Sequence, residues 1–93
     1  MKKIRRDLLL KQALAGKLIS VNSYNFDDMH GMEIRSNELP VNIISSNDDF
    51  KKNHCNLRRS CFDSSSGYAK IDEKGLIHLI VHSNENYIFR IVQ

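Results

Sequence analysis

The chain has no tryptophan, a single proline and only two cysteines in 93 residues. Without tryptophan, an apolar core has to be formed by Ile, Leu and Val with a few Phe and Tyr. No apolar stretch approaches the ~18 residues of a membrane-spanning helix, so we expect no membrane partner. The apolar run at 8–10 ends at Lys11, short of the roughly 7–15 residues of a secretory signal core. We therefore expect a cytoplasmic protein in which Cys55 and Cys61 are reduced.

The length of the chain allows one core and is too short for two, so we predict a single domain over residues 1–93. A hydrophobic content of 41% is enough for a globular core and too high for a disordered charged tail. The abundance of Asn, Ile, Lys and Ser is typical of a short bacterial or phage accessory protein.

Charge is segregated along the chain rather than mixed. Residues 1–17 carry a balance of +5, residues 18–50 a balance of −5 and residues 51–62 a balance of +4, within a total of +3. The acidic stretch includes Asp27, Asp28, Glu33 and Glu38. This layout favours binding to a charged partner, and its complementary patches also favour self-association, for example as a homodimer.

Residues 3–15 are predicted to form a helix, because most of them are good helix formers and Gly16 can end the helix in a left-handed conformation. One side of this helix carries the apolar residues Ile4, Leu8, Ala15 and Leu18. A second apolar stripe, Leu9, Leu10 and Ala13, points elsewhere. Two interpretations stay open. Either the helix is wedged between the sheet and the loops, or the second stripe is a contact surface for a partner or a second copy.

A second helix is predicted over residues 47–61. Ser46 or Asn47 can cap it, and acidic residues follow in its first turn. Its apolar stripe consists of Phe50, His54, Leu57 and Cys61. The basic residues of this segment then lie on one flank and on the side opposite the stripe: Lys51 and Arg58 on the flank, Lys52 and Arg59 opposite.

Strands are predicted on both sides of this second helix. Residues 19–24, 32–35 and 41–45 alternate polar and apolar side chains, which indicates a three-stranded meander. Residues 68–72, 76–82 and 87–92 form three more strands, joined by turns at 72–75 and 83–86. The predicted fold class is α+β, with an N-terminal helix, an antiparallel sheet of five or six short strands and a second helix inserted midway.

The candidate zinc ligands are His54, Cys55, Cys61, His78 and His82. Cysteines of structural zinc sites are typically two to four residues apart, whereas five residues separate Cys55 from Cys61. His78 and His82 lie in a predicted strand, where four residues span about 13 Å, too far for one ion. We therefore expect no metal.

Other catalytic arrangements fail on similar grounds. His54 and Cys55 are neighbours on a predicted helix, so they diverge by about 100° and lack an orienting third group. The serine-rich loop at 64–67 precedes a strand and lacks the helix dipole that binds phosphate. The acidic pairs at 27–28 and 48–49 have no His or Lys partner at useful spacing. We expect no catalytic residues, no cofactor and no enzymatic activity.

The hypothesis that follows is a small protein-binding inhibitor, adaptor or regulator that acts through charged and apolar surface patches. The predicted contact residues are basic or apolar: Arg5, Arg6, Leu9, Leu10, Lys51, Lys52, Arg58 and Arg59. The alternative is a DNA- or RNA-binding regulator that uses the basic helices, because phosphate contacts need only cationic side chains within reach. Against this alternative, the sequence contains no RRM, KH or cold-shock motif, and its pI of about 9.0 is only at the threshold for such domains.

Overall fold

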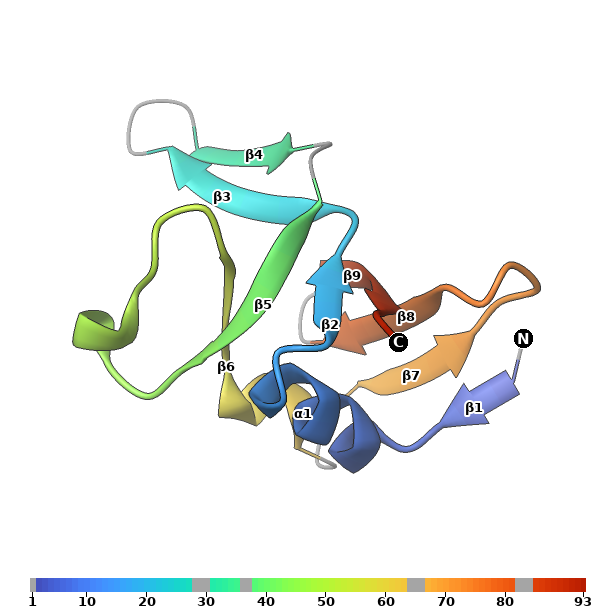
Figure 1. Ribbon diagram of the computed structural model, residues 1–93. Helices are drawn as coiled ribbons and strands as arrows, with labels where there is room; N and C mark the ends of the chain where they lie inside the picture. The colour runs from blue at the N-terminus through green and yellow to red at the C-terminus, as the bar shows by residue number, and fades with distance from the viewer. Residues whose placement is uncertain (1, 28–30, 36–37, 64–66, 82–84) are drawn as a thin grey trace.

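A computed structural model describes the chain except for residues 1, 28–30, 36–37, 64–66 and 82–84 (Figure 1). At 23–27, 31–35 and 47 it describes the backbone only. The helical elements are α1 (Arg6–Leu14) and two short 3-10 turns, η1 (Asn47–Asp49) and η2 (Arg59–Phe62). The strands are β1 (Lys2–Ile4), β2 (Leu18–Ser20), β3 (Ser23–Asp27), β4 (Gly31–Arg35), β5 (Leu39–Ile44), β6 (Cys55–Arg58), β7 (Tyr68–Ile71), β8 (Ile77–Val81) and β9 (Glu85–Ile91).

A seven-stranded mixed sheet dominates the molecule, in the order β1-β7-β8-β9-β2-β5-β6. All its neighbours are antiparallel except β5 and β6, which are parallel. The only α-helix of the described residues, α1, packs against β2 and β5 of this sheet (Figure 1). The predicted fold class, with two helices beside an antiparallel sheet, is therefore wrong. The fold is sheet-dominated, and its sheet is mixed.

The three C-terminal strands confirm the prediction made from their alternating pattern. β7, β8 and β9 form an antiparallel meander in which Ile77, Leu79 and Val81 are buried. The first turn runs from Asp72 to Gly75, and Gly75 has the positive φ (85°) expected of a turn glycine.

The predicted meander of residues 19–45 is wrong in its pairing. β2 pairs directly with β5, and β3 pairs with β4 in a separate two-stranded sheet. In Figure 1 this hairpin projects from the end of the large sheet at which β5 lies. Alternating side chains identify strands but not their partners, so neighbours along the sequence need not be neighbours in the sheet.

The second helix, predicted over 47–61, does not form. Within this range lie η1, the strand β6 and the start of η2. Cys55 and Leu57 are buried in alternation along β6, whereas Phe50, the first residue of the predicted stripe, is 66% exposed. The bend before β6 contains Asn53 with a φ of 65°, a conformation that a helix cannot contain. The side chain of Asn56 then holds this bend by bonding the N–H and the C=O of Lys51.

The first helix forms, but it begins later than predicted and buries its second stripe. Because residues 2–4 are a strand, Ile4 is not part of the helical pattern. Leu9 and Ala13 are buried, whereas Leu8 on the predicted core side is 49% exposed. Of the two interpretations, the wedged helix is therefore correct for Leu9 and Ala13.

The core lies between one face of the sheet and α1. It contains Leu9, Ala13, Leu18, Val41, Cys55, Leu57, Phe62, Ala69, Ile77, Leu79, Val81, Tyr87 and Phe89. The opposite face of the β1–β7–β8–β9 part of the sheet carries Lys3, Lys70, His78 and Ile88 in one cross-strand row. In the part of the chain that the structure describes, no helix is long and apolar enough to cross a membrane.

Candidate functional site

An open groove of about 530 Å³ lies where β1 and β7 diverge. Ile4 is the last residue of β1 and pairs with Ala69, after which the chain turns away into α1. The groove is lined by Lys3, Ile4, Arg5, Arg6, Asp7, Leu10, Phe62, Asp63, Gly67, Tyr68 and Ala69. Four segments that are far apart in the sequence therefore share one site: β1, the start of α1, the end of η2 and the start of β7.

The apolar part of the groove is built on the core. Phe62 is buried and stacks on Phe89, with ring centroids 6.5 Å apart. Ile4 and Leu10 are partly buried and pack against the same core. These contacts hold the apolar lining in place, so the groove does not have to be assembled by a ligand.

The charged part of the groove contains three cations and two acids: Lys3, Arg5 and Arg6, with Asp7 and Asp63. The Arg5 guanidinium donates to the Asp7 carboxylate through Nε at 3.1 Å and Nη2 at 2.7 Å. This hydrogen bond lowers the pKa of Asp7 below its ordinary value. Both side chains are largely exposed, so the pair adds little to stability and is available for rearrangement.

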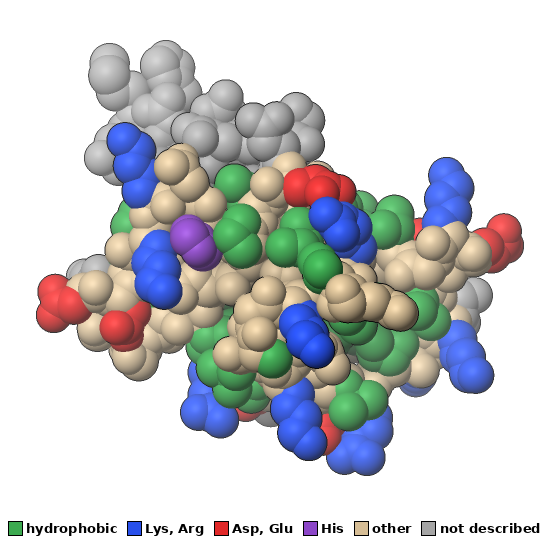
Figure 2. All heavy atoms as spheres, in the orientation of Figure 1, with side chains coloured by type: hydrophobic (Ala, Val, Ile, Leu, Met, Phe, Trp, Pro, Cys, Tyr) green, Lys and Arg blue, Asp and Glu red, His purple; other side chains and the backbone are tan. Residues whose placement is uncertain are grey.

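Tyr68, at the start of β7, also lines the groove, and its ring is on the same face of β7 as Lys70. It is 41% exposed, and Lys70 Nζ lies 4.9 Å from its ring centroid. This is a cation–π contact, which fixes the lysine over one face of the ring. In Figure 2, Lys and Arg side chains fringe the lower side of the molecule over α1, with hydrophobic side chains between them.

The structure brings together three of the predicted contact residues, Arg5, Arg6 and Leu10, because all three line the groove. The prediction that Leu9 contacts a partner is wrong. Leu9 has no exposed surface, since it faces the sheet from the middle of α1, and it cannot contact a partner. Of the two leucines predicted to contact a partner, only Leu10 is in a position to do so.

The four basic residues expected on a second helix are separated by β6. Lys51 and Lys52 are exposed in the loop before this strand. Arg58 ends β6, and Arg59 begins η2. The two arginines line a smaller cavity of about 220 Å³, together with Ile44, Ser45 and Ser46 at the end of β5. The helical placement predicted for these residues, with Lys51 and Arg58 on one flank and Lys52 and Arg59 opposite the apolar stripe, is thus wrong.

The predicted acidic surface is only partly described. Asp27, Asp28 and Glu33 lie outside the side chains that the structure describes. Glu38 makes a two-point ion pair with Arg90, with Nε–Oε1 at 2.9 Å and Nη2–Oε2 at 2.6 Å. Glu38 is therefore paired with a cation at the surface, and its pKa is lowered by that hydrogen bond.

Sequence reasoning missed Phe62, Gly67 and Tyr68 as site residues. Tyr68 is the first residue of the predicted strand 68–72, and Phe62 directly follows the predicted helix 47–61. The signal for them is non-local. They line the groove only because β1 pairs with β7, and no residue pattern within either segment shows that pairing.

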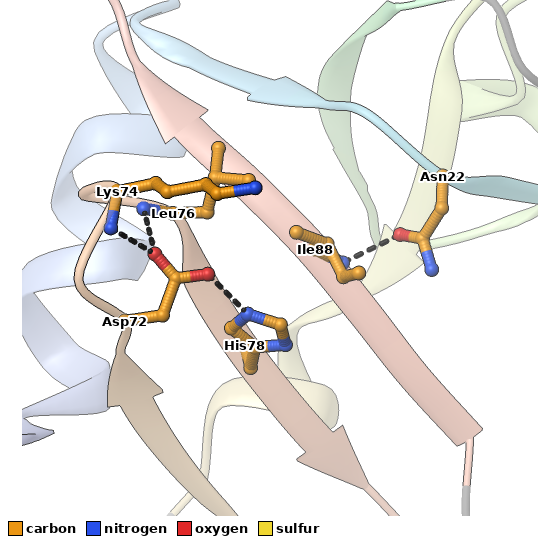
Figure 3. A network of polar contacts seen from close by, with 6 residues as sticks. All are labelled: Asn22, Asp72, Lys74, Leu76, His78 and Ile88. Carbon is orange, nitrogen blue, oxygen red and sulfur yellow. Dashed lines mark hydrogen bonds and ion pairs between the residues drawn. The ribbon is translucent and has the colours of Figure 1, made fainter. Parts of the chain in front are cut away.

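Asp72 and His78, outside the groove, are engaged in a structural contact. Asp72 Oδ2 lies 2.9 Å from His78 Nε2, while its Oδ1 accepts the N–H groups of Lys74 and Leu76 (Figure 3). Burial raises the pKa of the Cys55 thiol to about 11 and also raises the pKa of Cys61. Within the described ranges, no group of three or more His, Cys, Asp or Glu residues could hold a metal ion. Of the two cavities described above, the groove is the one that combines charged, aromatic and apolar side chains, and that chemistry is suited to binding.

Comparison of the chain with models of protein families, with curated proteins and with solved structures gives no match.

Proposed function

We propose that this protein is a non-enzymatic inhibitor, adaptor or regulator that binds a protein partner at the β1–α1–β7 groove. The observation that supports the proposal is the meeting of Arg5, Arg6 and Leu10 with Phe62 and Tyr68 around one cavity. A cytoplasmic location is part of the proposal, and the free thiols of the two cysteines are consistent with it.

The composition of the groove fits protein docking. Protein interfaces combine a buried apolar centre with a polar rim and are enriched in Tyr, Phe, Met and Arg. Here Phe62 and Leu10 supply the apolar centre, and Arg5, Arg6 and Tyr68 supply the rim. The volume of about 530 Å³ is large enough to take side chains of a partner.

Nucleic-acid binding is the second candidate, and Tyr68 is the observation that favours it. Single-stranded nucleic acid is bound by aromatic rings beside cationic side chains, and Tyr68 lies beside Lys70 and close to Lys3. Two features weigh against this candidate. Lys70 covers one face of the ring, and Asp7 and Asp63 bring negative charge into the groove.

Selection of peptides from a displayed random library, followed by NMR mapping of the selected peptides, tests the proposal. We expect the backbone amide shifts of residues 3–10 and 67–70 to change on binding, and Tyr68→Ala to weaken the affinity. Lys51→Glu is the matched control, because Lys51 is exposed and away from the groove.

The dependence of binding affinity on salt concentration distinguishes the two candidate functions. Binding of a single-stranded oligonucleotide should weaken steeply as salt rises, with a slope that follows the number of phosphates contacted. Peptide binding through Leu10 and Phe62 should persist. The proposal is wrong if the selected peptides leave the groove amides unchanged, or if only oligonucleotides shift them.

A further inference from the structure

The outer edge of β1 lies beside the groove and carries no neighbouring strand. β1 is the end strand of the sheet and pairs only with β7 among the described strands. Lys2 and Lys3 are exposed, and Figure 1 shows β1 at the margin of the sheet. An end strand presents N–H and C=O groups from alternate residues, which a further strand can pair with.

The extended stretch continues past the last residue of β1. Arg5 has φ −78° and ψ 129°, which is extended backbone, before α1 begins. Residues 2–5 thus span about 13 Å of extended backbone, in which the carbonyl of Arg5 already accepts the N–H of Leu8. That length ends at the groove, because Lys3, Ile4 and Arg5 all line it. A segment laid along the free edge of β1 would therefore place its side chains next to Lys3, Ile4 and Arg5, which also line the groove.

Charge decides which segment fits. Lys3 pairs directly with Lys70 across β1 and β7, and like charges in that position are unfavourable. A second copy of this chain would bring another Lys2 and Lys3 to the same edge and add to the repulsion. Edge lysines of this kind discourage self-pairing. An acidic side chain beside Lys3 would instead relieve the repulsion between the two lysines.

The side chains of β1 alternate between the two faces of the sheet, and this alternation determines the residue pattern of a segment that pairs with β1. Lys3 and Lys70 lie on the outer face of the sheet, whereas Ile4 and Ala69 lie on the core face. A neighbouring strand alternates in the same way. Its residues on the outer face meet Lys3, and those on the other face meet Ile4 and the apolar part of the groove near Leu10.

We infer that the partner of this protein binds through an extended segment with alternating acidic and apolar residues, which adds to β1 as a further strand of the sheet. This inference rests on the proposed function, since it names the partner class for the same groove. The acidic side chains pair with Lys3 on the outer face, and the apolar ones occupy the groove.

A short synthetic peptide of alternating Glu and Val is the probe, titrated into the full isotopically labelled chain. A peptide with the same composition, in a Glu block followed by a Val block, is the first control. A peptide of alternating Lys and Val is the second. We expect the alternating Glu–Val peptide to bind more tightly than either control and to protect alternate amides within residues 2–5, those that point to the free edge, from hydrogen exchange.

A charge exchange supplies the decisive comparison. Lys3→Glu places an acid opposite Lys70, a favourable cross-strand pair, so the variant should remain folded. It should weaken binding of the Glu–Val peptide by about fivefold and strengthen binding of the Lys–Val peptide by a similar factor. Lys52→Glu, with the same charge change in an exposed loop, should alter neither affinity.

The outcomes distinguish the inference from the proposed function. If library peptides shift the groove amides but residues 2–5 gain no protection and the charge exchange has no effect, strand addition is wrong and groove binding stands. If the two alternating peptides bind β1 equally well, charge complementarity is wrong. If neither the library nor the probe peptides shift the groove amides, both proposals are wrong.

Discussion

Asp72 and His78 connect the first C-terminal turn to the strand that follows it, with Asp72 Oδ2 2.9 Å from His78 Nε2. The same carboxylate accepts the N–H groups of Lys74 and Leu76, both at 2.9 Å. Figure 3 shows how one side chain holds the loop and the strand together. The β7–β8 connection therefore depends on the ionised form of Asp72, and this dependence can be measured.

The hydrogen bond to His78 lowers the pKa of Asp72 below its ordinary value of 3.8. A carboxyl group whose pKa is lowered by folding stabilises the native state above its ordinary pKa, and that contribution is lost as the pH falls through the folded-state value. We predict that Asp72→Asn reduces stability at pH 7 and that the difference from the wild type shrinks below pH ~4. Urea unfolding of both proteins between neutral and acidic pH measures this difference in the free energy of unfolding. A difference that stays constant over this range would contradict the role assigned to the carboxylate.

Leu9 and Leu8 are neighbours on α1 with opposite environments. Leu9 is 0% exposed and Leu8 is 49% exposed. We predict that Leu9→Ala lowers the free energy of unfolding by about 3 kcal/mol, because it leaves a cavity under the helix. Leu8→Ala should change it by less than about 0.5 kcal/mol. Chemical denaturation of the two variants checks which face of the helix is in the core. A larger loss from Leu8→Ala would reverse the assignment.

Gly67 and Gly16 have the same φ of 75° but different surroundings. A Cβ at Gly67 would collide with the carbonyl oxygen of Ile80, whereas nothing lies within 4 Å of a Cβ at Gly16. We predict a cost of about 1 kcal/mol for Gly16→Ala, from the left-handed backbone alone. The cost for Gly67→Ala should exceed about 3 kcal/mol, because the β7–β8 backbone has to move. Thermal and urea unfolding give both values, and equal costs would show that the close approach at Gly67 is absent.

The two thiols should differ in reactivity. Cys55 is 3% exposed, and burial raises its pKa to about 11, so only about one thiol in a thousand is ionised at pH 8. Cys61 is only partly buried. We predict that alkylation of the native protein at pH 8 modifies Cys61 at least about tenfold faster than Cys55. Peptide mass spectrometry after timed quenching measures both rates, with the urea-unfolded chain as the control. Faster labelling of Cys55 would contradict its burial on β6.

The sequence pattern predicted the C-terminal meander well, because each of its strands and its first turn are determined by residues close together in the sequence. Strict alternation at Ile77, Leu79 and Val81 and a turn that requires Gly75 specify strand, face and turn within a few residues. The same kind of reasoning failed at 47–61, where apolar residues also fit a helical stripe. There the alternation of Cys55 and Leu57 and the asparagine-rich bend were the better signal, and Phe50 was misleading because it is exposed.

The candidate site was predictable only in part. Arg5, Arg6 and Leu10 belong to one segment, and its mixed basic and apolar character marked it in the sequence. Phe62 and Tyr68 could not be added, because their position depends on the pairing of β1 with β7 across more than sixty residues. Leu9 was misassigned since two apolar stripes compete on one helix, and only the packed sheet decides which of them is buried.

The order of the strands has a consequence for synthesis on the ribosome. The first twenty residues contribute β1 and β2, which flank the meander of β7, β8 and β9 on its two sides. β1 pairs with β7 and β2 pairs with β9, which are made after residue 67, whereas β5, the other partner of β2, is made earlier. Leu9 and Leu18 pack in the same core as Leu79 and Phe89, so they lack part of their apolar surroundings until the strands over residues 68–91 have been made, and this part of the core forms after the strands on both sides of it.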